Sequence, residues 1–226
     1  MRQTYYALVS ELLRKFLRRL VVAGIFSACA GVDDAKPASV VAWGDSLTFG
    51  TGAAAGADYP SVLGQILGRT ATNLGVPGET STQVRARVSA DSGGAGGVVV
   101  FWMGTNNSYF PGVILADIAE SIASLRGNNR YLILPVMNRP TEYLGRAEHD
   151  LVLSTNDSLR SRYADHFVDV RQLLVDRFDA SSPQDVADHA ADVPPTSFRS
   201  DDVHLNAKGY GLVAHALADT IRARGW

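Results

Sequence analysis

VVVFWMGTNN, residues 98–107, is the stretch of sequence that decides the fold. Its first six residues are apolar without a break, which is typical of a strand buried on both faces of a parallel sheet. A glycine and three polar residues follow at once, at the carboxyl end of the strand, where α/β sheets place their ligands. The stretch therefore predicts a central parallel strand that carries polar side chains at a functional edge.

Short apolar runs and longer amphipathic stretches alternate on both sides of this strand. Four further runs predict strands, at residues 40–43, 71–74, 131–136 and 167–170. Amphipathic stretches predict helices at residues 59–69, 81–90, 113–125, 151–163 and 206–222. Strands that alternate with helices indicate an α/β fold, a three-layer α/β/α sandwich with a central parallel sheet of about five strands. The polar, proline-containing segment 180–200 is expected to be a long loop, and residues 40–226 are expected to form one domain.

Composition excludes several classes of protein. The chain has 226 residues, 46% hydrophobic and 19% charged, which is the profile of an ordinary globular domain. A formal net charge of -2 gives no electrostatic reason to expect a nucleic-acid partner. A single cysteine excludes a disulfide framework and a cysteine-based zinc site.

Residues 1–30 resemble a secretory signal. Five basic residues and only one acid, Glu11, precede an apolar run at residues 20–30, and small residues follow. The run is short for a helix that spans a bilayer. The alternative is an amphipathic helix packed on the domain. Residues 31–39 then form a linker, and the protein is expected to be exported to the bacterial periplasm or cell envelope.

The only cysteine, Cys29, lies at the end of this signal. Phe26-Ser27-Ala28-Cys29 resembles a bacterial lipobox, in which the cysteine is lipidated and becomes the mature N-terminus. Ordinary cleavage after Ala30 is the alternative. Cleavage before Cys29 removes five basic residues and one acid, so the mature chain becomes acidic. Such a protein would reach a membrane through its lipid anchor and not through a basic patch.

Polar residues follow the first strand and also stand near the C-terminus. Ser46, in Gly44-Asp45-Ser46, comes directly after a strand and before a helix, and Gly44 permits a sharp turn there. Its hydroxyl would be presented as in a nucleophile elbow, although a helix N-cap is the alternative. Near the C-terminus, Asp201 stands three residues before His204, where a carboxylate could hold the imidazole for proton transfer. A loop histidine before a helix is the alternative.

Two further stretches could supply hydrogen-bond donors. Gly75 follows the second strand, where a glycine lets a bare backbone N–H approach a ligand. Asn106 follows the third strand, and its amide could donate to a developing oxyanion. An ordinary glycine turn and a turn-forming asparagine are the alternatives.

Taken together and in this order, the four stretches resemble the SGNH hydrolase (GDSL esterase/lipase) superfamily, from Val40 to the terminal helix. The resemblance implies an SGNH, flavodoxin-like sandwich and a serine esterase. It implies Ser46 as nucleophile, His204 as general base and acid, and Asp201 as the group that orients His204. The oxyanion hole would be the Ser46 N–H, the Gly75 N–H and the side chain of Asn106.

The chain departs from the family pattern at Asn107, where an aspartate is usual. The departure leaves the donor in place but could change how the loop is braced. The role of Asp202 is open, and Asp201 is preferred only for its spacing from His204.

The implied reaction is acyl transfer to water through an acyl-serine, which needs neither a metal nor an organic cofactor.

Aromatic residues that could line the cleft or belong to the core are Trp43, Trp102, Tyr109, Phe110 and Tyr143. Residues 137–148 could cover the site. This segment is short, which favours a small acyl group, such as acetyl on carbohydrate or a cell-envelope glycan. Alternatives are a lysophospholipase or thioesterase, an acyltransferase, and a binding protein without catalysis.

Overall fold

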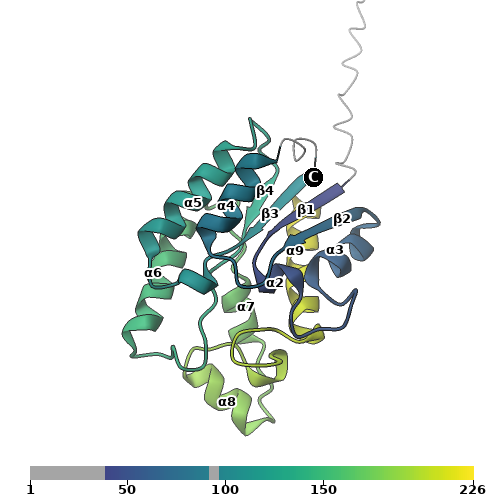
Figure 1. Ribbon diagram of the computed structural model, residues 1–226. Helices are drawn as coiled ribbons and strands as arrows, with labels where there is room; N and C mark the ends of the chain where they lie inside the picture. The colour runs from purple at the N-terminus through teal and green to yellow at the C-terminus, as the bar shows by residue number, and fades with distance from the viewer. Residues whose placement is uncertain (1–38, 92–96) are drawn as a thin grey trace, which may run out of the picture. The chain divides into compact units, whose positions relative to one another are not determined.

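Four parallel strands form the sheet of the described chain, which comprises residues 39–91 and 97–226 of a computed structural model. They are β1 (Ser39–Gly44), β2 (Thr70–Gly75), β3 (Val98–Trp102) and β4 (Tyr131–Ile133), in the order β2-β1-β3-β4. The register pairs Gly44 with Gly75 and with Trp102, so three strands end at one edge (Figure 1). The predicted α/β class is confirmed. The predicted signal and most of the predicted linker lie outside the described residues.

The fifth predicted strand is reduced to a single bridge. Ile133 pairs in parallel with Phe167, its N–H donates to the His166 carbonyl at 2.8 Å, and its carbonyl accepts from the Val168 N–H at 3.0 Å. The pairing cannot extend because helix α7 already begins at Val170.

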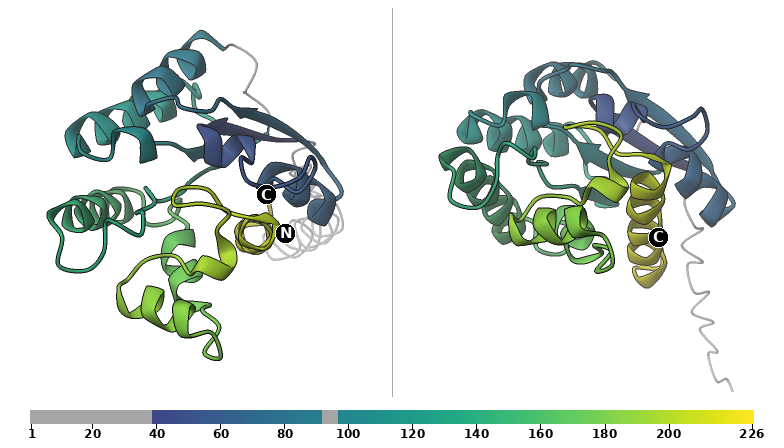
Figure 2. Two further views of the ribbon diagram at one scale, coloured as in Figure 1. Left: turned by 60° about the horizontal axis from the view of Figure 1, so that its bottom comes forward. Right: turned by 90° about the horizontal axis from the view of Figure 1, so that it is seen from below.

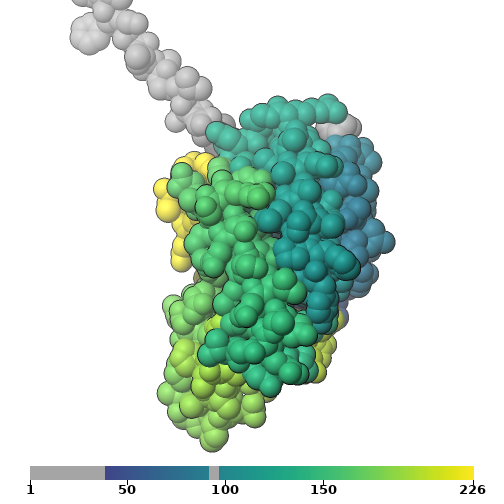
Figure 3. Space-filling model, turned by 90° about the vertical axis from the view of Figure 1, so that its left-hand side faces the viewer, coloured from purple at the N-terminus to yellow at the C-terminus, as the bar shows by residue number. Residues whose placement is uncertain are grey.

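Helices cover both faces of the sheet. They are α3 (Tyr59–Leu67), α4 (Ser81–Ala90), α5 (Pro111–Ala123), α6 (Ala147–Arg162), α7 (Val170–Asp176) and α9 (Ala207–Ala223). Val98, Val100 and Trp102 pack into one core cluster with α3, α7 and α9. Val99 and Phe101 pack into another with α4, α5 and α6. Figures 1 and 2 show the resulting three layers, and Figure 3 shows the outer surface of α5 and α6.

The segment 180–200, predicted as a long loop, contains helix α8 (Pro183–Ala190) and a 3₁₀ turn at Thr196–Phe198. Ser182 caps α8 and Pro183 occupies its first position, both of which favour a helix start. The polar composition of the segment obscured these signals. Figure 1 places α8 at the edge where the strands end.

No helix in residues 39–91 and 97–226 has the length and apolar character needed to cross a membrane.

Candidate active site

Ser46 is held where the first strand turns into a short helix. β1 ends at Gly44, the Asp45 carboxylate caps helix α2 (Ser46–Phe49) by accepting from the Leu47 N–H at 2.9 Å, and Ser46 is the first helical residue. A Cβ at Gly44 would lie 2.2 Å from both Thr48 Oγ1 and the Trp102 carbonyl. Glycine is therefore needed for close packing, whereas the sequence suggested a need for a sharp turn.

The structure brings Ser46, His204 and Asp201 together in one hydrogen-bonded line. The Ser46 Oγ lies 2.9 Å from His204 Nε2, and His204 Nδ1 lies 2.8 Å from Asp201 Oδ2. An ionised carboxylate can only accept, so the proton of a neutral imidazole lies on Nδ1 and Nε2 is left to accept from the serine. Ser46 is 6% exposed, so little of the residue reaches solvent. The arrangement can activate the hydroxyl by removing its proton.

A tight turn fixes Asp201 against the histidine. Its Oδ1 accepts from the backbone N–H groups of Val203 and His204, each at 2.7 Å. Burial raises the pKa of Asp201, but the bonds from His204 and Val203 outweigh it, so its pKa lies below the usual value. Asp202 lies 3.8 Å from Arg199, with its side chain 76% exposed. Of the two neighbouring aspartates, only Asp201 is bonded to the imidazole.

Two of the three predicted oxyanion donors are placed where they could act. The Ser46 N–H belongs to the first turn of a helix and has no partner within that helix. Asn106 lies in a 3₁₀ turn (Thr105–Asn107) that follows Gly104, whose φ is +117°. One N–H of the Asn106 amide donates to the Glu79 carbonyl at 2.8 Å, which orients the group and leaves the other N–H for a ligand.

The third predicted donor, the Gly75 N–H, is already bonded. It donates to the Asn73 side-chain oxygen at 2.9 Å, while the Asn73 amide donates to the Thr48 carbonyl at 2.8 Å. A Cβ at Gly75 would lie 2.1 Å from the Phe49 nitrogen. Gly75 thus lets β2 pack against α2, and the prediction that it is a free donor does not agree with this structure.

Gly78 is a better candidate for that donor, and the sequence reasoning missed it. It lies in the turn closed by the Glu79 N–H and the Val76 carbonyl at 3.3 Å, next to the carbonyl that Asn106 contacts. Its φ is +82°, and no hydrogen bond from its N–H occurs among the described residues. The signal was the second glycine of the stretch NLGVPG, residues 73–78.

Arg87 ties this turn to the end of β1. Its guanidinium binds the Glu79 carboxylate through Nε and Nη2, donates to the Leu74 carbonyl at 2.8 Å and to the Gly44 carbonyl at 3.1 Å, and lies over the Trp43 ring. The backbone on either side of the candidate nucleophile is thereby held in one position. Arginine in a helix is too common for the sequence to have indicated this role.

Asp45 is an unusual neighbour for a nucleophile because its carboxyl group is fully buried. Burial, with a smaller contribution from Glu79, raises its pKa to about 7. Its Oδ1 caps α2, whereas its Oδ2 has no partner among the described residues.

Asn107 braces the Asn106 turn against α4. Its side-chain oxygen accepts from the Ser81 N–H at 3.0 Å, and its amide donates to the Ser81 Oγ at 2.9 Å. The Ser81 hydroxyl then donates to Asp117 at 2.6 Å. A hydroxyl has a single proton, so an aspartate at 107 would compete with Asp117 for it. Asparagine therefore suits position 107, because Asp117 on α5 already accepts the Ser81 proton.

The aromatic residues divide between core and surface. Trp43 and Trp102 are buried in the core clusters, whereas Tyr109, Phe110 and Tyr143 are exposed.

The expected covering segment, 137–148, is fastened beside α8. The Asn138 amide donates to the Asp192 carbonyl at 3.0 Å, the Leu144 N–H donates to the Ala191 carbonyl at 2.9 Å, and Arg171 Nε donates to Asn138 at 2.8 Å. These bonds anchor the segment at the edge of the sheet that carries the candidate site.

The chain was compared with known proteins. A model of the GDSL-like lipase/acylhydrolase family matches residues 42–212. No curated protein matches the chain.

Among solved structures, a G-D-S-L family lipolytic protein from Desulfitobacterium hafniense is similar, with a TM-score of 0.63, 19% identity and coverage of 81% of this chain and 99% of that one. The acetyl xylan esterase AlAXEase is similar with a TM-score of 0.62 and 18% identity, and the match covers 80% of this chain and 98% of that one. The esterase EstA from Pseudoalteromonas sp., in a structure inhibited by monoethylphosphonate, is similar with a TM-score of 0.61 and 14% identity. The match covers 83% of this chain and 98% of that one. At these identities the likeness concerns the fold.

Proposed function

The chain belongs to the GDSL-like lipase/acylhydrolase family, and from this premise we propose that it is an exported serine esterase acting on short-acyl esters. Membership makes it a carboxylic ester hydrolase. The observation that carries the catalytic assignment is the line from Asp201 through His204 to Ser46, with separations of 2.8 Å and 2.9 Å.

The proposed reaction has two halves. The Ser46 Oγ attacks the ester carbonyl carbon while His204 Nε2 takes the serine proton. The negative charge on the carbonyl oxygen is met by N–H groups of Ser46, Asn106 and Gly78. The tetrahedral intermediate collapses to an acyl-serine, and His204 gives its proton to the departing alcohol. Water then enters and repeats the sequence, which releases the acid and restores the serine.

Asp201 is proposed to act on the histidine and not on the substrate. It holds Nδ1–H and stabilises the imidazolium that forms when His204 accepts the proton. Its lowered pKa keeps it ionised at neutral pH, as this role requires.

A small acyl group is supported by the exposed aromatic residues and the short segment after β4. Tyr109, Phe110 and Tyr143 remain on the surface and do not enclose an apolar tunnel. One structural neighbour is described as an acetyl xylan esterase. O-acetyl esters of carbohydrate are therefore the proposed substrates, and the basic and apolar character of residues 1–30 supports export.

The test is hydrolysis of p-nitrophenyl esters from acetate to palmitate by the mature protein and by Ser46→Ala. We expect the highest kcat/KM at acetate or butyrate and no turnover above background in Ser46→Ala. Ser121→Ala is the matched control and should retain activity. Ser121 is also buried, but its hydroxyl donates to the Asp117 carbonyl and not to His204. A phosphonate ester should modify Ser46 in the wild type only. A maximum at palmitate would contradict the short-acyl assignment, and activity in Ser46→Ala would contradict the nucleophile.

A further inference from the structure

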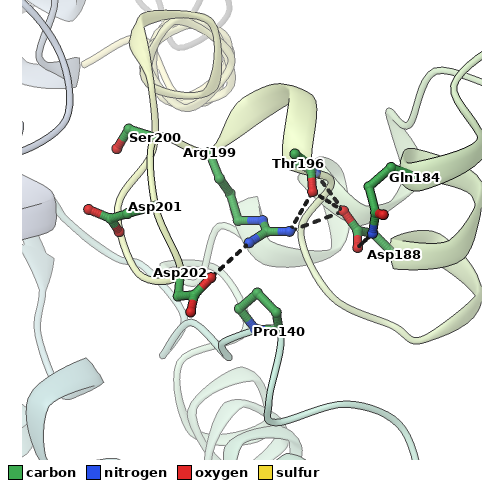
Figure 4. A pocket seen from close by; sticks show the side chains of 8 residues that line it. All are labelled: Pro140, Gln184, Asp188, Thr196, Arg199, Ser200, Asp201 and Asp202. Atoms are coloured by element: carbon green, nitrogen blue, oxygen red, sulfur yellow. Dashed lines mark hydrogen bonds and ion pairs between the residues drawn. The ribbon is translucent and has the colours of Figure 1, made fainter.

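A pocket of about 360 Å³ adjoins the candidate triad at the turn that carries Asp201. Figure 4 shows the residues that line it, which are Pro140, Gln184, Asp188, Thr196, Arg199, Ser200, Asp201 and Asp202. Asp201 belongs to both places, because its Oδ2 contacts His204 while its residue forms part of the pocket wall. Asp201 therefore connects the pocket to His204, the group that would protonate the departing alcohol.

The lining chemistry excludes several ligands. Seven of the eight lining side chains carry a polar group, Pro140 being the exception, so most of them can hydrogen-bond to a ligand. None of the lining residues is aromatic, so the pocket lacks the cage that quaternary ammonium groups favour. Three carboxylates face a single guanidinium, which disfavours an anionic ligand such as a phosphate ester.

Arg199 stands at the centre of the pocket with part of its donor capacity unused. Its Nε donates to the Pro194 carbonyl at 2.8 Å, and its Nη2 donates to Thr196 Oγ1 at 2.7 Å and to Asp188 at 3.1 Å. Within residues 39–91 and 97–226, its Nη1 has only a loose ion pair with Asp202, at 3.8 Å, which is beyond hydrogen-bond distance. Figure 4 shows Asp188 and Thr196 on one side of the guanidinium and Asp202 on the other.

Arg199 Nη1 and the Asp202 carboxylate, 3.8 Å apart, could be bridged by one hydroxyl lying beside them. A hydroxyl can accept from the guanidinium and donate to the carboxylate at the same time, which no purely anionic or cationic group can do. Gln184 and Ser200 add side chains that can both donate and accept. The volume is at the lower end of the range for small-molecule pockets, which fits a sugar ring better than a longer ligand.

We propose that this pocket binds a neutral, polyhydroxylated unit of the alcohol half of the ester, one sugar residue removed from the acylated one. This inference rests on the proposed esterase function and assigns the alcohol as an oligosaccharide. The His204 ring and the Asp201 carboxylate, linked by contacts of 2.9 Å and 2.8 Å, stand between Ser46 and the pocket, so only a unit beyond the acylated sugar could reach it. Binding energy from this remote unit would position the scissile ester.

Asp202→Asn tests the proposal because it removes the charge and keeps the size of the side chain. Asp219→Asn is the matched control, since Asp219 has the same loose pair with an arginine three residues away, at 3.8 Å, and is 78% exposed on α9. Activity is measured on acetylated xylo-oligosaccharide and on p-nitrophenyl acetate, whose alcohol is too small to reach the pocket. In Asp202→Asn, the kcat/KM for the acetylated xylo-oligosaccharide divided by the kcat/KM for p-nitrophenyl acetate should fall about tenfold. Asp219→Asn should leave the ratio as in the wild type, and an equal ratio in both variants would overturn the proposal.

A binding measurement separates this proposal from the esterase function. Calorimetry of Ser46→Ala with unacetylated xylotetraose should detect binding, and adding Asp202→Asn should weaken it about tenfold. Binding without turnover in the wild type would retain the pocket and reject the esterase, and turnover of p-nitrophenyl acetate without sugar binding would do the reverse. A lysophospholipid ester provides the anionic arm. If Asp202→Asn accelerated its hydrolysis while leaving sugar esters unaffected, the alcohol would be anionic and the proposal would be wrong.

Discussion

Asp45 shows how the position next to a nucleophile constrains one side chain. Its Oδ1 is needed to cap α2, yet the same burial that orders the cap leaves Oδ2 without a partner among the described residues. An ionised carboxylate is costly in such a place, and a neutral carboxyl is less so. Burial therefore favours the neutral carboxyl and raises the pKa of Asp45 to about 7.

The unfolding free energy should therefore depend on pH through Asp45. Between its ordinary pKa of 3.8 and about 7, the folded protein holds a proton that the unfolded chain has released. The stability gained from that proton is complete below pH 3.8 and is lost as the pH rises through 7. Asp45→Asn keeps an N-cap of equal quality and removes the titration.

Denaturant unfolding of both proteins from pH 4 to pH 8 measures the effect. The free energy of the wild type minus that of Asp45→Asn should fall with rising pH, by about 1.4 kcal/mol per unit at most, and level off above pH 7. Parallel curves over the whole range would show that Asp45 titrates normally.

Loss of the Asn106 side chain should lower turnover without affecting the fold. It is exposed, and among the described residues its side chain bonds only to the Glu79 carbonyl. Asn106→Ala should lower kcat by about 10²–10³ with little change in KM, because the oxyanion exists only during the reaction. Asn128→Ala removes a similar bond, to the Gly97 carbonyl, and is the control. A loss confined to KM would instead indicate a role in substrate binding.

Elements, more than single residues, hold the histidine turn in place. α8 presents two carboxylates to the chain that leads to His204. Asp185 accepts from the Ser197 N–H and hydroxyl, at 3.1 Å and 2.5 Å, and Asp188 accepts from the Thr196 N–H and hydroxyl, at 2.6 Å and 2.7 Å. The helix thus supplies the firm support that a catalytic loop requires.

The turn after β3 and helices α4 and α5 are joined through Asn107, Ser81 and Asp117, and the connection should be sensitive to charge. Asn107→Asp should destabilise the protein by about 1–3 kcal/mol, since two carboxylates would then share one hydroxyl proton. In an Asp117→Asn background the same change should cost less, because Asp117→Asn removes the competing acceptor. A double-mutant cycle by thermal or denaturant unfolding gives the coupling energy. Equal costs in both backgrounds would mean that the two side chains act independently.

At the scale of elements, sequence reasoning succeeded for the central strand and for two of the helices that cover the sheet. The unbroken apolar run of β3 and the helices α4 and α9 were predicted nearly to the residue. It failed at α8, a helix of eight residues in a polar, proline-containing segment, where Asp185 and Asp188 are buried as hydrogen-bond acceptors. It also predicted a fifth strand where only one bridge forms.

The site was predicted only in part, because some of its contacts depend on where a side chain points or join residues that are distant in sequence. Ser46, His204 and Asp201 follow from residue type and order along the chain, and the structure places them in contact. The choice between Gly75 and Gly78 depends on where Asn73 directs its side-chain oxygen, which no local pattern specifies. Likewise, the contact of Arg87 with the Gly44 carbonyl joins residues 43 positions apart.

At the scale of the whole molecule, the fate of the first thirty residues decides where the enzyme acts. We expect a bacterium that expresses the full chain to attach labelled palmitate to it and to retain it in the membrane fraction. Cys29→Ser should abolish both, since Cys29 is the only thiol. Esterase activity should be unaffected, because the site lies in the domain that follows. Absence of label from both proteins would indicate ordinary signal cleavage.

The contact between Ser46 and His204 joins residues 158 positions apart, from the helix after the first strand and the turn before the last helix. A chain that emerges from its N-terminus can form much of the sheet before His204 is available. Hydrolysis therefore begins only when the last elements have docked. A protein made in the cytoplasm and folded after export would remain inert towards esters in the compartment where it is synthesised, without any inhibitor or propeptide.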